Sequence, residues 1–161
     1  MSHRSTSHYS HRIAAAPSKV FPLLCPVREY EWIDVWQGKL VYSVSGFAEE
    51  DCVFTTNSFA SIGPETWICS RYEPPARIDY TRVSAHTAIR LALSLKAEGE
   101  GTLLSAAYIA TATTETGEAF LEELGPEPAT AIYRPCFLML DHFLRTGTML
   151  PSGEAKAHAT R

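Results

Sequence analysis

The sequence predicts a single α+β domain in which a curved antiparallel sheet packs against one long C-terminal helix. Three observations support this fold class. The chain has 161 residues, of which 45% are hydrophobic and 20% charged, a composition that supplies one core and excludes disorder of the whole chain. Apolar residues alternate with a period of two over residues 40–113. After residue 128 the apolar spacing becomes that of an α-helix.

The N-terminal segment predicts one strand followed by two short helices. The strand runs over residues 5–13, and the residues on its inner side are Ser7, Tyr9, His11 and Ile13. Pro17 suits the first position of a short helix, because proline lacks the N–H that this position leaves unpaired. Pro26 suits the first position of a second short helix over residues 27–32.

The middle of the chain predicts six consecutive strands. Turn residues separate these strands, which span residues 40–45, 51–59, 66–72, 77–83, 87–97 and 102–113. Short connections indicate an antiparallel meander with one buried face. In the strand over 87–97 the residues expected on the buried face are Ile89, Leu91, Leu93 and Leu95.

Helical periodicity returns in the last third of the chain. A short helix is expected over residues 116–124, and a longer one over 129–146, where Pro135 should kink the helix or shift its start. The apolar stripe of the long helix consists of Ala129, Ile132, Tyr133, Cys136, Phe137, Leu140, Phe143 and Leu144. This stripe must be buried against the inner face of the sheet. Residues 149–161 are small and polar, and we expect a flexible tail there.

Charge and cysteine usage exclude several classes of protein. The net charge is −4, so the chain lacks the excess of basic residues that is typical of a general nucleic-acid binder. No apolar run reaches the length of a membrane span, and residues 1–8 lack the apolar segment of a secretory signal. The cysteines form no C-x-x-C pair, so we interpret them as reduced thiols of a cytoplasmic protein; they are Cys25, Cys52, Cys69 and Cys136.

The order of these elements resembles the START-like, or SRPBCC, superfamily. Residues 13–21, Ile-Ala-Ala-Ala-Pro-Ser-Lys-Val-Phe, are similar to the strand-to-helix junction of that superfamily. The six-strand meander, residues 113–120 and the terminal helix complete the resemblance, which covers residues 8–148. It implies the helix-grip fold, in which a seven-stranded sheet wraps the C-terminal helix and encloses an apolar cavity. One ligand-binding domain would then span residues 5–148.

The resemblance leaves three functions open, because the superfamily includes carriers, enzymes and chaperone cofactors. The first is binding of a small hydrophobic or aromatic ligand, lipid-like or polyketide-like, in the cavity between sheet and helix. The second is an enzyme of the polyketide cyclase or aromatase type that uses an acid or base in the pocket. The third is a partner-binding regulator of the chaperone-activator kind. We expect no cofactor, and either a monomer or a homodimer.

The candidate catalytic residues are the titratable residues that the pattern can place at the cavity, namely Glu29, His11 and Tyr80. Glu29 is either a pocket acid or a solvated surface residue, and His11 is either a pocket residue or a structural histidine. The candidate ligand-binding residues are Tyr9, His11, Trp32, Trp36, Trp67, Tyr80, Arg82, Tyr133, Cys136 and Phe137. An inward Arg71 or Arg82 would need a partner, which would suggest recognition of a carboxylate or phenolate ligand.

The sequence predicts no metal site. His8 and His11 lie on opposite faces of the first strand, so they cannot bind one ion together. The chain also contains no H-E-x-x-H, G-x-S-x-G or glycine-rich phosphate loop. These absences argue against metalloprotease, serine-hydrolase and nucleotide chemistry.

Overall fold

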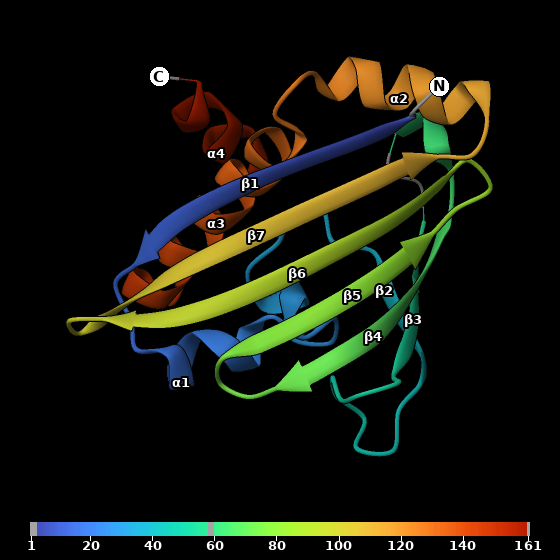
Figure 1. The fold of residues 1–161 in the computed structure, drawn as a ribbon. Coiled ribbons are helices and arrows are strands. Elements are labelled where there is room, and N and C mark those ends of the chain that lie inside the picture. The colour runs from blue at the N-terminus through green and yellow to red at the C-terminus, as the bar shows by residue number, and fades with distance from the viewer. Residues whose placement is uncertain (1–2, 58–59, 161) are drawn as a thin grey trace.

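One antiparallel sheet organises the protein in a computed structural model that describes residues 3–57 and 60–160. The sheet has seven strands in the order β1-β7-β6-β5-β4-β3-β2. Their bounds are β1 Arg4–Ile13, β2 Gly38–Tyr42, β3 Val53–Thr56, β4 Glu65–Glu73, β5 Arg77–Val83, β6 Thr87–Glu98 and β7 Gly101–Ala112. Figure 1 shows the helices on one face of this curved sheet and across one of its ends. This confirms the predicted α+β fold with a seven-stranded antiparallel sheet.

The strands differ from the expected ranges only at their ends. The strand predicted over residues 40–45 starts two residues earlier, at Gly38, and the strand predicted over residues 51–59 is shorter. Residues 58–59 lie outside the described part of the chain. β1 pairs with β7, so the first strand joins the far side of the meander. The alternation in β6 is as predicted, because the four residues expected inside, Ile89, Leu91, Leu93 and Leu95, are all buried.

Short helical turns follow β1 and cover one end of the sheet. They are α1 Pro17–Val20 and the 3₁₀ turns η1 Phe21–Leu23 and η2 Glu29–Glu31. A further 3₁₀ turn, η3 Ala60–Ile62, follows β3 and contacts the helix over residues 115–124. The second helix predicted over residues 27–32 is therefore wrong in type, since only a single 3₁₀ turn forms. The indole N–H groups of Trp32 and Trp36 donate to the carbonyls of Leu23 and Pro26, at 3.0 and 2.8 Å. These bonds fold the segment back on itself, so that a continuous helix cannot form.

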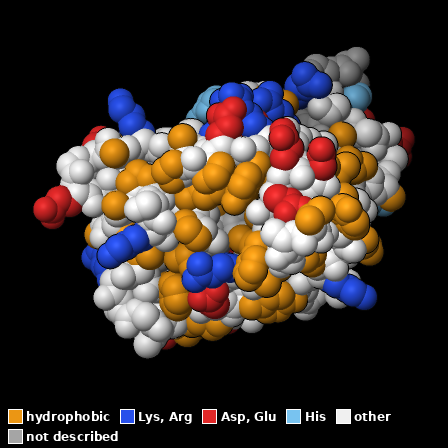
Figure 2. Space-filling view, turned by 90° about the horizontal axis from the view of Figure 1, so that it is seen from below, with side chains coloured by type: hydrophobic (Ala, Val, Ile, Leu, Met, Phe, Trp, Pro, Cys, Tyr) orange, Lys and Arg blue, Asp and Glu red, His pale blue; other side chains and the backbone are white. Residues whose placement is uncertain are grey.

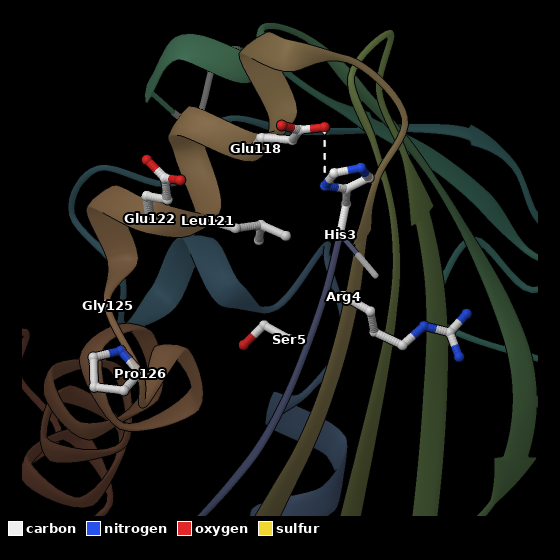
Figure 3. A pocket seen from close by; sticks show the side chains of 8 residues that line it. All are labelled: His3, Arg4, Ser5, Glu118, Leu121, Glu122, Gly125 and Pro126. Carbon is white, nitrogen blue, oxygen red and sulfur yellow. Dashed lines mark ion pairs between the residues drawn. The ribbon is translucent and has the colours of Figure 1, made fainter. Parts of the chain in front are cut away.

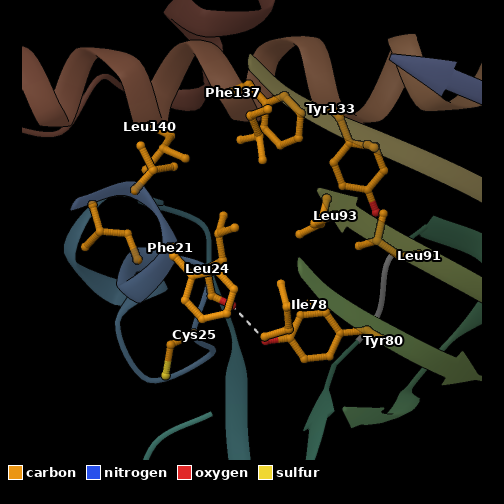
Figure 4. Close-up of a cluster of buried hydrophobic side chains, with 14 of the residues drawn as sticks. Phe21, Leu24, Cys25, Ile78, Tyr80, Leu91, Leu93, Tyr133, Phe137 and Leu140 are labelled. Atoms are coloured by element: carbon orange, nitrogen blue, oxygen red, sulfur yellow. Dashed lines mark hydrogen bonds between the residues drawn. The ribbon is translucent and has the colours of Figure 1, made fainter. Parts of the chain in front are cut away.

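The long helix α3, Pro128–Thr146, follows the shorter α2, Glu115–Leu124. α3 contains Pro135 and ends at Gly147, whose φ of 73° is the left-handed conformation that favours glycine. Two bonds fix α3 to β1. The backbone N–H of Ala129 donates to Ser7 Oγ at 2.8 Å, and that of Ala14 donates to Asp141 Oδ1 at 2.9 Å. The sheet and α3 enclose the hydrophobic core between them (Figure 4).

The C-terminal segment differs from its prediction as a flexible tail. Within residues 149–161, Ser152–Ala159 form a helix, α4, which packs on α3. Ala155 is fully buried there, and the backbone N–H of Ser152 donates to Asp34 Oδ2 at 3.1 Å. The contact uses alanine rather than large apolar residues, so no apolar stripe marks α4 in the sequence. Among the described residues no helix is long and apolar enough to cross a membrane, and all four cysteines are free thiols.

Candidate functional site

Aromatic side chains from β1, β7 and α3 form one side of the interior, which we call the helix-side wall. Phe137 is at its centre, with ring centroids 5.9 Å from Tyr9 and 5.7 Å from Tyr133. Tyr108 extends the wall from Tyr133, at 6.1 Å. His11 contacts Phe137 at 6.5 Å and its Nδ1 lies 2.8 Å from the hydroxyl of Tyr9. Four residues predicted as ligand-binding from the sequence thus meet on one surface.

A second aromatic group, the sheet-side wall, comes from β3, β4, β5 and the segment after η2. Phe54 stacks on Trp67 at 5.1 Å and meets Tyr80 edge-on at 5.5 Å. Trp36 contacts Trp67 at 6.4 Å. Figure 4 shows Tyr80 on the opposite side of the core from Tyr133 and Phe137, with side chains of β6 between them. Tyr80 of the sheet-side wall therefore lies across the core from Tyr133 and Phe137 of the helix-side wall.

Glu29 is a half-buried acid on η2. Burial of its carboxyl group raises its pKa to about 8. No described residue donates a hydrogen bond or forms an ion pair with this carboxyl. Part of the residue remains accessible to solvent.

Tyr80 and Cys136 are the titratable neighbours of Glu29, on β5 and α3 respectively. Burial is the main reason that the pKa values of both groups rise, and the nearby carboxyl group of Glu29 raises them further. Both are therefore neutral at physiological pH. Cys136 is half-buried as a residue.

Arg82 also points inward, and its partner is Glu65. The Nε of Arg82 donates to Glu65 Oε1 at 3.0 Å and an Nη to Oε2 at 2.5 Å, in a fully buried bidentate pair. The ring of Trp67 covers the guanidinium at 4.1 Å. The partner that an inward Arg82 needs is therefore a carboxylate of the protein itself and not that of a ligand. Arg71 is exposed and pairs with Glu73 at 2.8 Å.

Two hollows open on the surface of the described residues. One of about 230 Å³ lies at the end of the core where η1 meets the loop after β2. Its lining residues are Phe21, Pro22, Leu24, Cys25, Arg28, Phe47, Ala48, Tyr72 and Ile78. Figure 2 views the molecule from below and shows hydrophobic side chains gathered across that face. Because Phe21, Leu24 and Ile78 also belong to the core, this pocket borders the interior.

The other hollow, of about 460 Å³, is a surface groove between the start of β1 and α2. Figure 3 shows its lining, which consists of His3, Arg4, Ser5, Glu118, Leu121, Glu122, Gly125 and Pro126. His3 Nδ1 lies 3.0 Å from Glu118 Oε1 across it. None of the ligand-binding residues predicted from the sequence lines either hollow. Within residues 3–57 and 60–160 no three histidine, cysteine or acidic side chains are grouped to hold a metal ion.

Comparison with known proteins identifies solved structures that have a similar fold. No protein-family model matches the chain, and no curated protein matches its sequence. Norcoclaurine synthase from Thalictrum flavum, solved with dopamine and hydroxybenzaldehyde, superposes with a TM-score of 0.63 at 8% identity, over 88% of this chain and 87% of that chain. CalU16 from Micromonospora echinospora gives 0.54 at 21% identity, over 98% and 94%. The chain has the helix-grip fold.

A third structure with this helix-grip fold is DynU16, a protein of the dynemicin biosynthetic locus. It matches with a TM-score of 0.58 at 14% identity, over 89% of this chain. This chain spans about half of DynU16, 48% of its length. At these identities the likeness concerns the fold.

The other candidate residues, among them Tyr80, His11 and Trp32, have different environments within this fold. Tyr80 donates its hydroxyl proton to the carbonyl of Leu24 at 2.7 Å, so that proton is engaged within the protein. Burial lowers the pKa of His11, against the opposing effect of Asp141, and the ring is neutral at pH 7. Trp32 is 1% exposed and is a core residue. Of the three candidate acids and bases, Glu29 is the one whose side chain has no hydrogen-bond partner among the described residues.

Glu65 is an interior residue that sequence analysis missed, as are Phe54 and Tyr108 of the two walls. Its position carried a signal, because Glu65, Trp67 and Cys69 alternate along β4 and all three are buried. Period-two alternation therefore places Glu65 on the same face as the predicted Trp67. An inward arginine on the next strand then requires a buried acid of this kind.

Proposed function

We propose that the helix grip binds a small planar hydrophobic ligand between the helix-side wall and the sheet-side wall. The observation that supports this proposal is the Glu29 carboxyl group, whose pKa burial raises to about 8 and which has no partner among the described residues. A buried polar group that lacks a hydrogen bond destabilises a fold, so such groups are uncommon unless a ligand or water completes them. The aromatic walls on either side suit a planar molecule, because ring faces and edges pack in offset and T-shaped pairs.

Two solved structures with a similar fold support this proposal, one by its bound compounds and the other by its biosynthetic locus. Norcoclaurine synthase holds dopamine and hydroxybenzaldehyde, which are both small aromatic compounds, and DynU16 belongs to the dynemicin biosynthetic locus. The pocket of about 230 Å³ supplies a path to the interior, because Leu24 and Ile78 border it on the inside and Phe47 on the outside. Phe47 is 52% exposed and lies on a loop, so it can move without disturbing the core.

Thermal stability in the presence of 2-naphthol tests the proposal. The melting midpoint of the wild-type chain should rise with probe concentration, by the equivalent of about 2.7 kcal/mol at one hundred times the dissociation constant. Cys136→Trp should fill the space next to Glu29 and abolish the shift while the protein remains folded. Ala131→Trp, on the exposed side of α3, is the matched control and should keep the shift. If Cys136→Trp unfolds the protein and 2-naphthol leaves the wild type unchanged, the interior is packed core and the proposal fails.

Catalysis of the polyketide cyclase type is the second candidate, and the pKa of Glu29 favours it. A carboxyl group that titrates near pH 8 can remove a proton from a carbon next to a ketone and return it to oxygen. A poly-β-ketone bound between the walls would be enolised in this way before ring closure. Glu29→Gln should then retain binding and lose turnover of such a substrate. Equal turnover by the variant and the wild type would leave binding as the whole activity.

A further inference from the structure

We propose that Cys52 and Cys69 are a site of reversible oxidation, at which a hydroperoxide converts the two thiols into a disulfide bond. This modification site does not depend on ligand binding in the interior. Cys52 directly precedes β3, and Cys69 lies on β4, the neighbouring strand of the sheet. The bond would therefore crosslink two adjacent strands.

Backbone pairing places the two cysteines opposite each other. The N–H of Cys69 donates to the carbonyl of Cys52 at 3.0 Å, and the N–H of Asp51 donates to the carbonyl of Cys69 at 2.9 Å. From this point the pairing of β3 with β4 continues, with Val53 opposite Ile68. Asp51 has a φ of 64°, so residues 51 and 52 form a β-bulge opposite Cys69. The position of the pair is thus fixed by hydrogen bonds on both sides.

The two side chains share the buried face of the sheet. Cys52 and Cys69 are both fully buried. The residues two positions along the same strands, Phe54 and Trp67, are buried as well. Opposed residues of an antiparallel pair have Cα atoms about 4.5–5.5 Å apart, and disulfides span Cα separations of about 4.4–6.8 Å. The backbone at this pair therefore suits a crosslink.

A small oxidant can approach the pair from the surface. Tyr72 lines the pocket of about 230 Å³. Burial raises the pKa of the Tyr72 hydroxyl, and the nearby thiols of Cys25, Cys69 and Cys52 raise it further. The turn that precedes Cys52 is exposed at residues 50 and 51, so local opening of this turn uncovers the sulfur from the other side.

Cys52 is the thiol that reacts first. A hydrogen bond with the thiol of Cys69 lowers the pKa of Cys52 to about 7, which raises its thiolate fraction above that of an ordinary cysteine. This thiolate attacks one oxygen of hydrogen peroxide, becomes a sulfenic acid and releases hydroxide. The sulfur of Cys69 then attacks the sulfenic sulfur and displaces water. The two sulfurs give two electrons to the peroxide, so two thiols and one peroxide become one disulfide and two waters.

Peptide mapping of the folded wild-type chain tests the proposal. The chain has no lysine or arginine between Lys39 and Arg71, so the tryptic peptide 40–71 contains both cysteines. After treatment with hydrogen peroxide and alkylation in denaturant, mass spectrometry should show this peptide without label and lighter by two hydrogen atoms. Cleavage after Glu65 should leave its two parts joined until dithiothreitol restores both thiols. The remaining cysteines of the chain should be alkylated.

Variants distinguish this pair from general oxidation of thiols. Cys52→Ala and Cys69→Ala should each prevent the crosslink. Cys25→Ala is the matched control, because it removes the other buried thiol near Tyr72, and it should form the crosslink as wild type does.

Three results on the wild type would overturn the proposal, and none of them depends on a variant folding. One is complete alkylation of all four cysteines after peroxide. Another is a crosslink that includes Cys25 or Cys136. The third is a sulfinic acid at Cys52 with the thiol of Cys69 still free.

Discussion

Glu29 and Glu31 are two residues apart and have opposite environments. The 3₁₀ turn η2 has three residues per turn, so its first and last side chains point in different directions. Glu31 lies at the surface, and the hydrogen bond from Arg28 lowers its pKa. Glu29 is half-buried, and burial of its carboxyl group raises its pKa. One short turn therefore holds both a solvated acid and an interior acid.

The interior position of Glu29 predicts a dependence of stability on pH. Its pKa is about 8 in the folded protein against an ordinary value of 4.5, so the folded state holds a proton that the unfolded state releases. Wild-type stability should fall by up to about 1.4 kcal/mol per pH unit as pH rises from 4.5 to 8. Glu29→Gln should lose this slope and melt at a higher temperature than wild type at pH 8, with little difference at pH 4.5.

Thermal melting from pH 4 to pH 9 measures this effect. Glu31→Gln is the control, and between pH 5 and 8 its stability should fall with the same slope as wild type. Parallel curves for wild type and Glu29→Gln would place the carboxyl group of Glu29 in solvent.

Two hydrogen bonds between distant parts of the chain hold α3 against β1 and the residue that follows it. Glu127, at the N-cap position of α3, makes no capping hydrogen bond through its side chain. Ser7 of β1 supplies one instead, because its Oγ accepts the N–H of Ala129. At the other end Asp141 binds the N–H of Ala14, just after β1. A residue distant in sequence thus caps the helix and sets its place on the sheet.

Loss of the Ser7 cap should destabilise the protein. Ser7→Ala removes the acceptor for a buried N–H and should lower the free energy of unfolding by about 1 kcal/mol, as loss of a helix cap does. Ser10→Ala, three residues along the same strand and on its exposed side, should have less than about half that effect. Urea denaturation monitored by circular dichroism compares them. Equal effects for the two variants would mean that Ser7 does not cap α3.

The packing of α4 on α3 gives a second test at this scale. Ala155 is fully buried at this contact, whereas Ala157 of the same helix is exposed. Ala155→Glu should bury a charge without a partner and separate α4 from α3, with a lower melting midpoint and a loss of helical signal. Ala157→Glu should change neither. If Ala155→Glu melts like wild type, α4 does not stabilise the rest of the fold.

At the scale of the whole molecule, the Arg82–Glu65 pair joins two strands of the sheet behind the sheet-side wall. Trp67 covers this pair, and the hydroxyls of Tyr108 and Tyr133 interact with Arg82 from β7 and α3. Strands from both sides of the sheet, together with α3, therefore meet around one buried charge pair. Such a pair is stabilising only while both members remain.

Single substitutions in this pair should cost much more than the double substitution. Arg82→Met or Glu65→Leu alone leaves an unpaired buried charge and should destabilise by about 3–5 kcal/mol. The double variant replaces the pair with apolar side chains and should recover most of that loss. Chemical denaturation of the four proteins gives the coupling energy. Additive losses would show that the two charges are solvated independently.

Local pattern in the sequence was sufficient for the architecture. The alternation of Ile89, Leu91, Leu93 and Leu95 predicts both the strand β6 and its buried face, because side chains alternate between the two faces of a strand. The apolar spacing around Phe137 and Leu140 likewise predicts α3 and the side that meets the sheet. α3 ends at Gly147, whose backbone adopts the left-handed conformation that favours glycine.

The interior chemistry was decided by tertiary structure. The indole hydrogen bonds of Trp32 and Trp36 to the carbonyls of Leu23 and Pro26 form only in the folded chain, and no local periodicity in the sequence predicts them. The partner of Arg82 depends on the pairing of β4 with β5. Periodicity follows from the geometry of one element and can be read along the chain. Electrostatic environment depends on which side chains several elements bring within a few ångströms, so it arises only when the chain has folded.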